Sequence, residues 1–213
     1  MTSFQAEREL MVTNQIAARG ISDEKVLDAM RKVPRHLFVP EEARRYAYTD
    51  SPVRIGSGQT ISQPYIVALM TALLQVESQH RVLDVGTGSG YQAAILAEIA
   101  SQVYSIERHA ALAEEAERRL RALGYANVSV HVGDGTRGLA EYAPFDRIVV
   151  AAAAPKVPIA LVEQLADGGR MVIPVGERFS QHLEIWERNG GEINKHSGIP
   201  VVFVPLVGEN GWD

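Results

Sequence analysis

The sequence contains no cysteine among its 213 residues. A disulfide framework, a catalytic thiolate and a zinc site built on cysteine are therefore excluded. The chain also lacks an uncharged apolar run of the roughly 18 residues that a membrane-spanning helix needs, so no membrane association is expected. Its first residues, MTSFQAEREL, lack the basic and then apolar pattern of a secretory signal. These features lead us to expect a cytoplasmic protein.

An excess of basic residues is missing too. The chain has 21 Lys and Arg against 26 Asp and Glu, for a formal net charge of −5. Proteins that follow nucleic-acid phosphates carry a basic excess, so no nucleic-acid partner is expected. Hydrophobic residues make up 46% of the chain and charged residues 22%, which is typical of a globular protein. The length is enough for one domain with a sizeable core, and we expect a monomer.

The first part of the chain, residues 1–78, predicts a helical segment. Residues 4–19 form the first expected helix. Residues 22–33 form the second, with Ser22 as its N-cap. A short third helix is expected over 41–48. This segment should pack on the part of the chain that follows.

Residues 79–213 change to an alternation of strands and helices. The expected strands are 81–85, 102–107, 128–132, 146–152 and 170–176, and the expected helices are 91–100, 110–123 and 158–166. Such alternation predicts right-handed βαβ units and a mostly parallel sheet. A Gly-Gly turn between two extended runs near the end predicts a C-terminal antiparallel hairpin. The fold class is therefore α/β, doubly wound and Rossmann-like, as a single domain over 1–213 with the helical segment 1–78 laid on the core 79–213.

A glycine-rich loop, LDVGTGSGY, follows the first expected strand. Glycines at alternate positions allow a tight turn and let the backbone approach a ligand beside a helix N-terminus. The same pattern also occurs in strand-to-helix turns that bind nothing. Acids at three successive strand ends favour a ligand, because Glu107 can accept from both ribose hydroxyls of a nucleoside and Asp134 would lie beside its base. The expected nucleoside site comprises Asp84, Gly86, Thr87, Gly88, Ser89, Gly90, Glu107, Arg108, Asp134 and Gly135.

The spacing of the loop bears on which nucleoside it binds. A dinucleotide fingerprint reads G-x-G-x-x-G and receives a pyrophosphate, whereas this loop reads G-x-G-x-G. Asp84, two residues before it, would repel a pyrophosphate but suits a cationic ligand. S-adenosylmethionine carries both a sulfonium and an ammonium group, so we favour it as the cofactor. An oxidoreductase that binds NAD(P) stays open as the alternative.

Several motifs together resemble a known family. The segments VLDVGTGSGYQAA, SIER, GDG, FDRIVVAAAAP and DGGRMVIPVG resemble, in this order, the motifs of class I methyltransferases. Together with GQTISQPYIVA, they closely resemble the protein-L-isoaspartate O-methyltransferase family, from about residue 4 to Val207. The resemblance implies methyl transfer from S-adenosylmethionine to the free α-carboxylate of L-isoaspartyl residues in damaged proteins and peptides. It leaves S-adenosylhomocysteine as product and starts repair through a succinimide. Some members have Thr where this chain has Val207, which puts any side-chain hydrogen bond at that position in question.

The residues after the fourth expected strand agree with a carboxylate acceptor. Enzymes that methylate bases place a polar tetrad with an aromatic tip there, whereas this chain has AAAAP at 151–155. A carboxylate with a pKa near ~4 is already ionised at neutral pH and needs no general base. The six histidines are scattered without metal-ligand spacing, so no metal is expected. A methyltransferase acting on another small molecule or on RNA stays open as an alternative.

The segment TISQP, residues 60–64, is the candidate acceptor site. It would place the Ser62 hydroxyl and backbone N–H groups at a helix N-terminus, which favours an anion. Capping of that helix by Ser62 or Gln63 is the competing interpretation. The resemblance implies Ser62 as the catalytic residue and Ile61, Ser62, Gln63 and Pro64 as substrate contacts. Gly56 and Gly58 are expected to leave room for a peptide backbone.

Overall fold

The N-terminal segment is helical, as predicted, in the computed structural model, which describes residues 3–213. Helix α1 (Ser3–Met11) continues through a π turn and a 3-10 turn and ends at Gly20, whose φ of 95° is left-handed. In α2 (Glu24–Lys32) the predicted N-cap, Ser22, is wrong by one residue. Asp23 takes that position, because its carboxylate accepts from the Lys25 N–H at 3.0 Å. The first two residues of the predicted segment 1–78 lie outside the described residues.

The expected third helix is not α-helical. Residues Glu41–Tyr46 form a 3-10 segment, η4, and a shorter one, η3, spans Arg35–Phe38. The hydrogen bonds run from residue i+3 to residue i, as from Ala43 N–H to the Pro40 carbonyl at 2.9 Å. A run this short between turns does not propagate an α-helix.

The polar stretch before TISQP forms a hairpin that periodicity does not predict. Strands β1 (Val53–Gly56) and β2 (Gln59–Ile61) pair antiparallel. The turn between them has positive φ angles at Gly56 (105°) and Gly58 (70°). A side chain at either glycine would meet no neighbouring atom within 4 Å. These glycines serve the backbone of the turn and leave open space beside it. That a peptide backbone occupies this space stays a prediction.

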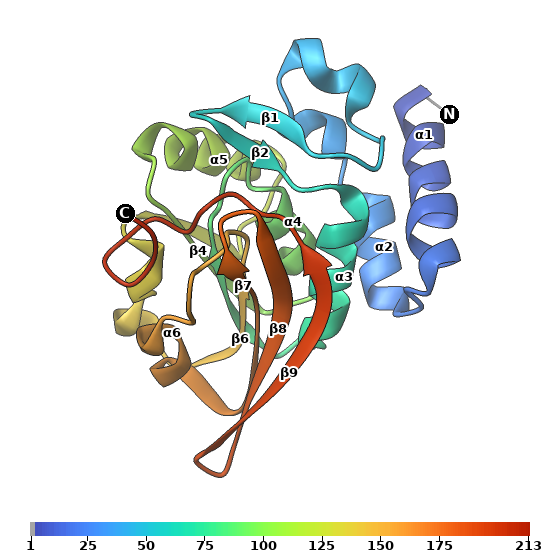
Figure 1. Ribbon diagram of the computed structural model, residues 1–213. Coiled ribbons are helices and arrows are strands. Elements are labelled where there is room, and N and C mark those ends of the chain that lie inside the picture. Colours follow the sequence, from blue (N-terminus) through green and yellow to red (C-terminus); the bar gives the residue numbers. More distant parts are fainter. Residues whose placement is uncertain (1–2) are drawn as a thin grey trace.

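The second part of the chain builds one seven-stranded sheet. Its order is β5-β4-β3-β6-β7-β8-β9. The strands are β3 (Arg81–Val85), β4 (Gln102–Glu107), β5 (Val128–Val132), β6 (Phe145–Val150), β7 (Leu165–Glu177), β8 (Ser180–Asn189) and β9 (Glu192–Val201). Strands β3 to β7 pair in parallel, and β7, β8 and β9 pair antiparallel. The Rossmann-like fold class with a C-terminal hairpin is confirmed, and the hairpin is visible at the lower edge in Figure 1.

The connecting helices are shorter than expected. They are α3 (Pro64–Leu74), α4 (Tyr91–Ala97), α5 (Ala110–Ala122) and α6 (Ile159–Glu163). The helix predicted over 158–166 ends early because Leu165 already pairs with Phe145 of β6. Phe145 N–H also donates to the Gln164 carbonyl at 2.9 Å. Strand pairing thus takes residues whose local pattern favours a helix.

Side chains on the two faces of the sheet enter two buried clusters. Val82 and Val149 pack with Met30 of α2 and Leu74 of α3, so the N-terminal segment and the sheet share one core. On the opposite face, residues of β3, β6 and β7 pack against Leu161 of α6. Figure 1 shows α1, α2 and α3 on one side of the molecule and α6 on the other.

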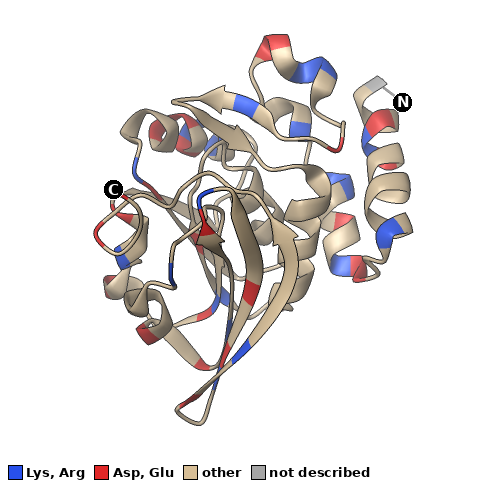
Figure 2. Ribbon diagram, viewed as in Figure 1, with Lys and Arg blue, Asp and Glu red and all other residues tan. Residues whose placement is uncertain are grey.

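The order of strands defines where a ligand site is expected. From the central pair β3 and β6, the chain proceeds outward through β4 and β5 on one side and through β7 on the other. Ligands of doubly wound folds bind at the carboxyl ends of the strands where the order reverses. In the ribbon of Figure 2, positions of basic and acidic residues are interspersed along the chain. No helix within 3–213 is both long and apolar enough to cross a membrane.

Candidate active site

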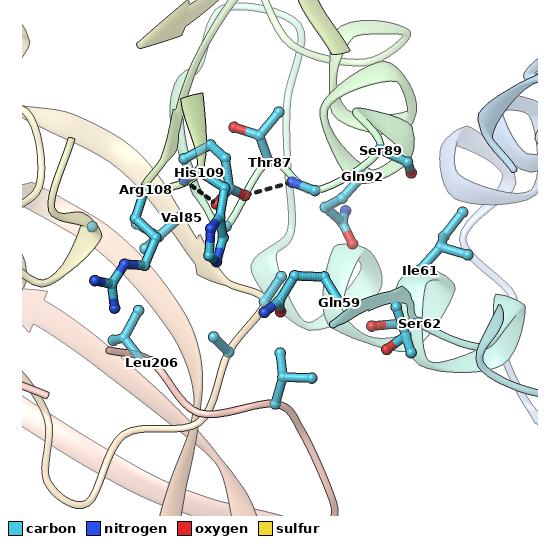
Figure 3. Close-up of a pocket in the computed structure, with 18 of the residues that line it drawn as sticks. Gln59, Ile61, Ser62, Val85, Thr87, Ser89, Gln92, Arg108, His109 and Leu206 are labelled. Carbon is cyan, nitrogen blue, oxygen red and sulfur yellow. Dashed lines mark hydrogen bonds between the residues drawn. The ribbon is translucent and has the colours of Figure 1, made fainter. Parts of the chain in front are cut away.

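A cleft lies at the carboxyl ends of β3, β4 and β6. The empty space in and in front of this cleft, open solvent included, is about 930 Å³. Its walls are the glycine loop after β3, residues 107–109 after β4, strand β2 with Ser62, and the segment 204–207 from the end of the chain. Figure 3 shows Thr87 at the top of the view, Arg108 on the left, and Ile61 and Ser62 on the right.

The glycine loop turns sharply at the end of β3. Gly86 and Gly88 have φ angles of 95° and 53°, a backbone conformation that residues other than glycine rarely adopt. Gly86 N–H donates to the Ile106 carbonyl at 2.9 Å, which fixes the loop to the neighbouring strand. Below the loop, the hydroxyls of Thr87 and Ser105 lie 2.6 Å apart. The backbone of the loop is therefore held against the cleft by contacts on the protein side.

Glu107 ends β4 with its carboxylate held in place. One oxygen accepts from Gly88 N–H at 2.9 Å and the other from His109 N–H at 3.0 Å, the two dashed bonds in Figure 3. The side chain is buried and lines the cleft. A carboxylate offers about four lone-pair positions, so each oxygen keeps one for a further donor. Two adjacent hydroxyls, as on a ribose, match this arrangement.

Asp84 lies fully buried under the same loop. One carboxylate oxygen, Oδ2, accepts from the Ser105 hydroxyl at 2.7 Å. The other oxygen, Oδ1, is buried and has no hydrogen-bond partner among residues 3–213. Burial raises the pKa of Asp84 to about 7, the Ser105 hydrogen bond opposes this rise, and the nearby charge of Glu107 adds to it. An unpartnered buried acceptor at this place fits a cofactor with a cationic group.

Asp134 holds the turn after β5 through its carboxylate, and its place beside a base stays a prediction. It is absent from the lining of the main cleft and borders a small neighbouring cavity. Its carboxylate caps the short turn Gly135–Arg137, accepting from Thr136 N–H at 2.9 Å, and also accepts from Glu209 N–H at 2.8 Å. Partial burial would raise the pKa of Asp134, but the bonds from Glu209 and Thr136 together lower it. Asp134 thus positions the turn that presents Gly135 to the cleft.

The structure brings most of the predicted cofactor residues to the cleft. Those that line it are Gly86, Thr87, Gly88, Ser89, Glu107, Arg108 and Gly135. Arg108 is exposed at its rim. Asp84, Gly90 and Asp134 do not line it. Gly90 instead starts α4 in a left-handed conformation, and a side chain there would meet Leu120 at 3.2 Å.

A second cavity adjoins the first on the side of the C-terminal hairpin. Its empty space, open solvent included, is about 1870 Å³, and its lining includes Gln63, the turn between β7 and β8, and residues 199–205. Ser62 lines both cavities and so stands where they meet. Of the other predicted substrate contacts, Ile61 lines the first cavity and Gln63 the second. Pro64 is buried as the first residue of α3 and lines neither.

Neither Ser62 nor Gln63 caps α3, so the capping interpretation is wrong. Gln63 occupies the N-cap position, and its side chain makes no capping bond. The carboxylate of Asp50, from the loop before β1, accepts from Tyr65 N–H in the first turn at 3.2 Å. Within the described residues, the Ser62 hydroxyl has no hydrogen-bond partner. It is half-buried at the junction of the cavities and available to a ligand.

Sequence reasoning missed part of the cleft lining. Gln59 and the segment 204–207 line the cleft, although no local pattern marks them. The segment reaches the cleft because Ala153 N–H donates to the Val204 carbonyl and Leu206 N–H to the Ala153 carbonyl, both at 2.8 Å. Such pairing over fifty residues leaves no trace in spacing. Val207 lines the cleft with a side chain that cannot form a hydrogen bond.

Groups of acidic or histidine side chains suitable for a metal are absent from the described residues 3–213. The chemistry that the cleft offers is therefore that of a held carboxylate, a glycine-lined backbone and a free hydroxyl beside a helix N-terminus. These features match a nucleoside in one cavity and an anionic acceptor where the two cavities meet.

Comparison with known proteins places this site in a family. The family described as Protein-L-isoaspartate(D-aspartate) O-methyltransferase (PCMT) matches residues 6–211. Protein-L-isoaspartate O-methyltransferase 1 of Syntrophobacter fumaroxidans is 53% identical over 214 residues, covering 100% of both chains. The Methanoculleus marisnigri protein-L-isoaspartate O-methyltransferase is 54% identical over 206 residues, covering 97% of this chain and 94% of the relative.

A solved structure agrees with these sequence matches. The Plasmodium falciparum protein described as a protein-L-isoaspartate O-methyltransferase, in complex with S-adenosyl-L-homocysteine, superposes with a TM-score of 0.82. It is 29% identical, and the match covers 94% of this chain and 98% of the other. The alternative of an NAD(P)-dependent oxidoreductase is thereby set aside. This chain belongs to the protein-L-isoaspartate O-methyltransferase family, the S-adenosylmethionine-dependent enzymes that methylate L-isoaspartyl residues in protein repair.

Proposed function

We propose that the first cavity holds S-adenosylmethionine, the second holds the isoaspartyl peptide, and Ser62 receives the acceptor carboxylate between them. The observation that carries this assignment is the place of Ser62. Ser62 lines both cavities, and its side chain is not used to cap α3. A residue that only stabilised the helix would have its hydroxyl turned to the backbone of the first turn.

On the cofactor side, three features would hold S-adenosylmethionine. The carboxylate of Glu107 would accept from the ribose hydroxyls, and the glycine loop would let the backbone approach the ligand. The unpartnered Oδ1 of Asp84 provides a negative charge near the loop for the ammonium group. When bound, the cofactor supplies a methyl group activated by the sulfonium charge. Arg108 and Gly135 would complete the wall around the cofactor. Gly90 and Asp134 would contribute indirectly, by fixing the backbone of the loops that line the cavity.

On the acceptor side, the residues need only to hold an anion in line. A carboxylate with a pKa near ~4 is ionised at neutral pH, so no side chain has to remove a proton. The Ser62 hydroxyl and the N-terminus of α3 favour negative charge at the junction. Ile61, Gln63 and Pro64 fix the path of the backbone into that N-terminus. Correct placement alone supplies a large part of the barrier reduction in such a transfer.

The second cavity has the character of a peptide site. Phe179, in the turn between β7 and β8, is 85% exposed, and Val202 is 70% exposed, yet both line the cavity. Arg19 and Arg178 also line it. Exposed apolar side chains around a concave surface mark sites that bind other molecules. We therefore assign this surface to residues that flank the isoaspartate.

The remaining parts of the proposal concern the whole chain. We propose one domain over 1–213, in which 1–78 packs on the nucleoside-binding core 79–213, because both parts contribute to one buried cluster. We propose a monomer in the cytoplasm that binds no nucleic acid. The net charge of −5 supports the last point. Gel filtration at micromolar concentration and cell fractionation test the first two.

A two-peptide assay tests the proposed acceptor. Peptides identical except for aspartate or L-isoaspartate at one position are incubated with S-adenosylmethionine labelled in the methyl group. Base-labile label should enter the isoaspartyl peptide at least about tenfold faster, since only its carboxylate can reach Ser62 in line with the methyl group. Equal labelling of both peptides would remove the substrate assignment.

A further inference from the structure

Arg35 is a fully buried cation that lies behind the acceptor loop. It belongs to η3, and its side chain has an exposed fraction of 0%. Its Nε donates to the Ala47 carbonyl at 2.8 Å, and its Nη2 donates to the Ser62 carbonyl at 2.7 Å. One guanidinium thus joins the loop before β1 to the residue at the junction of the two cavities.

The charge of Arg35 is not neutralised by an ion pair. Among the described residues, no carboxylate lies within ion-pair distance of it. Burial lowers the pKa of Arg35, and Tyr91, Tyr48 and Asp50 oppose this effect. The carboxylate of Asp50 already pairs with Arg19 at 2.6 Å. The Tyr91 ring faces the guanidinium at 4.8 Å, and Nη1 has no hydrogen-bond partner in residues 3–213. Burying an unpaired charge is costly, so its retention calls for a reason beyond packing.

The bond to the Ser62 carbonyl fixes the orientation of the next N–H group. The peptide bond between Ser62 and Gln63 is trans, so its carbonyl and its N–H point in opposite directions. Because Arg35 draws the carbonyl toward the core, the Gln63 N–H is turned away from the core. That N–H donates to no acceptor within the described residues and precedes α3, where donors favour an anion.

We propose that Arg35 is a positioning residue for methyl transfer: it orients the Ser62–Gln63 peptide and supplies an unneutralised positive charge behind the acceptor carboxylate. The inference rests on the proposed role of Ser62. The charge acts through the low-dielectric interior and attracts the ionised acceptor more than a neutral group of the same shape. Arg35 itself does not line either cavity and does not touch the reacting atoms.

The test replaces Arg35 with Met or with Lys in the full-length protein. Arg35→Met should raise KM for the isoaspartyl peptide about tenfold or more, while affinity for S-adenosylmethionine changes less than about twofold. Arg35→Lys keeps the charge but cannot donate to both carbonyls in the planar fork geometry, so its KM should lie between those of wild type and Arg35→Met. Active sites are counted by titration with S-adenosylhomocysteine, so that a partly unfolded preparation does not distort the result.

A neutral isostere separates charge from general damage. In the presence of S-adenosylhomocysteine, calorimetry compares the isoaspartyl peptide with one whose α-carboxylate is a carboxamide. Wild type should prefer the anion, and Arg35→Met should lose most of that preference. Leu27→Ala, in the core of α2 at 3% exposure, is the matched control that lowers stability without touching the loop. It should keep both the preference and KM.

The Arg35 variants test the inference, and a Ser62 variant tests the proposed function separately. An unchanged KM in Arg35→Met overturns the inference, as does a parallel loss of cofactor affinity. If Arg35→Met does not fold, a wild-type KM in Arg35→Lys overturns it instead. Ser62→Ala is measured alongside. Normal KM and kcat in that variant would contradict the proposed role of Ser62, whereas an impaired Ser62→Ala with an unaffected Arg35→Met would contradict only the inference.

Discussion

At the scale of single residues, the acids at the strand ends have different environments and should behave differently. Glu107 has both oxygens engaged by backbone N–H groups and faces the cleft. Asp84 is fully buried with one oxygen unpartnered, and Asp134 accepts from Thr136 and from Glu209 in the C-terminal loop. The sequence places all three at strand ends, but their separate roles depend on which donors surround each one.

Glu107→Gln should weaken S-adenosylmethionine binding without unfolding the protein. The amide keeps one acceptor for a backbone N–H but loses the charge that strengthens bonds to ribose hydroxyls. Hydrogen bonds to charged groups contribute about 1.5–3 kcal/mol, so affinity should fall by about ten- to a hundredfold. Calorimetric titration measures the affinity, and circular dichroism checks the fold. Wild-type affinity in the folded variant would remove Glu107 from the site.

Asp84→Asn should stabilise the protein while it weakens cofactor binding. The folded pKa of about 7 lies above the ordinary value of 3.8, so folding favours the protonated form. The cost of the buried carboxylate therefore grows as pH rises from about 4 to about 7 and is complete above pH 7. The neutral amide avoids that cost, so the gain in melting temperature over wild type should be larger at pH 8 than at pH 5. Melting curves at both pH values measure this difference.

The same substitution should also change how cofactor affinity depends on pH. In wild type, affinity for S-adenosylmethionine should fall as pH drops through about 7, because protonation removes the buried charge beneath the loop that is proposed to attract the ammonium group. Asp84→Asn should bind more weakly at pH 8 and show little of this dependence. If the variant keeps the wild-type pH dependence of affinity, Asp84 does not interact with the cofactor.

At the scale of elements, the strand-end loops were predictable and the acceptor side was not. Strands β3, β4 and β5 and the helix stops follow from local apolar runs and glycines, so the glycine loop and Glu107 could be located from the sequence. The β1–β2 hairpin depends on positive φ angles in a polar turn and has no hydrophobic period. The segment 204–207 reaches the cleft only through pairing with Ala153. Capping of α3 by Asp50 likewise depends on a contact between distant loops.

Substitution of Asp50 should lower stability, and substitution of Ser62 should lower catalytic efficiency. Asp50→Ala removes the acceptor at the first turn of α3 and should cost about 0.5–2 kcal/mol of unfolding free energy. Ser62→Ala removes a hydroxyl that makes no bond within the described protein, so its melting temperature should stay near wild type. Its kcat/KM should fall by about ten- to a hundredfold, the loss of a bond to a charged acceptor. Melting curves and kinetics on the same preparations provide both values.

The opposite pattern would restore the capping interpretation. A lowered melting temperature with near-normal kcat/KM in Ser62→Ala would mean that the hydroxyl serves the helix. Affinity for S-adenosylmethionine provides the internal control, because Glu107 and the glycine loop remain intact in both variants. Asp50→Ala can also release Arg19, which lines the second cavity, so its peptide KM is compared only after its stability is known.

At the scale of the whole molecule, the cleft joins segments from both ends of the chain. Strand β2 and Ser62 come from the N-terminal part, the glycine loop and Glu107 from the middle, and the segment 204–207 from the end. The N-terminal helices share a buried cluster with β3 and β6. A ligand in the cleft would therefore contact the N-terminal part, the sheet and the C-terminal segment 204–207 at the same time.

Binding of S-adenosylhomocysteine should accordingly stabilise the protein as one unit. Thermal unfolding without ligand should show a single transition, because separating 1–78 from 79–213 would expose the shared cluster. A ligand at about 100 times its Kd adds about 2.7 kcal/mol. For a domain of this size that corresponds to about 5–10 °C in melting temperature. Calorimetry should show the whole transition moving; two transitions, of which ligand shifts only the later one, would mean that the helical segment folds as a separate domain.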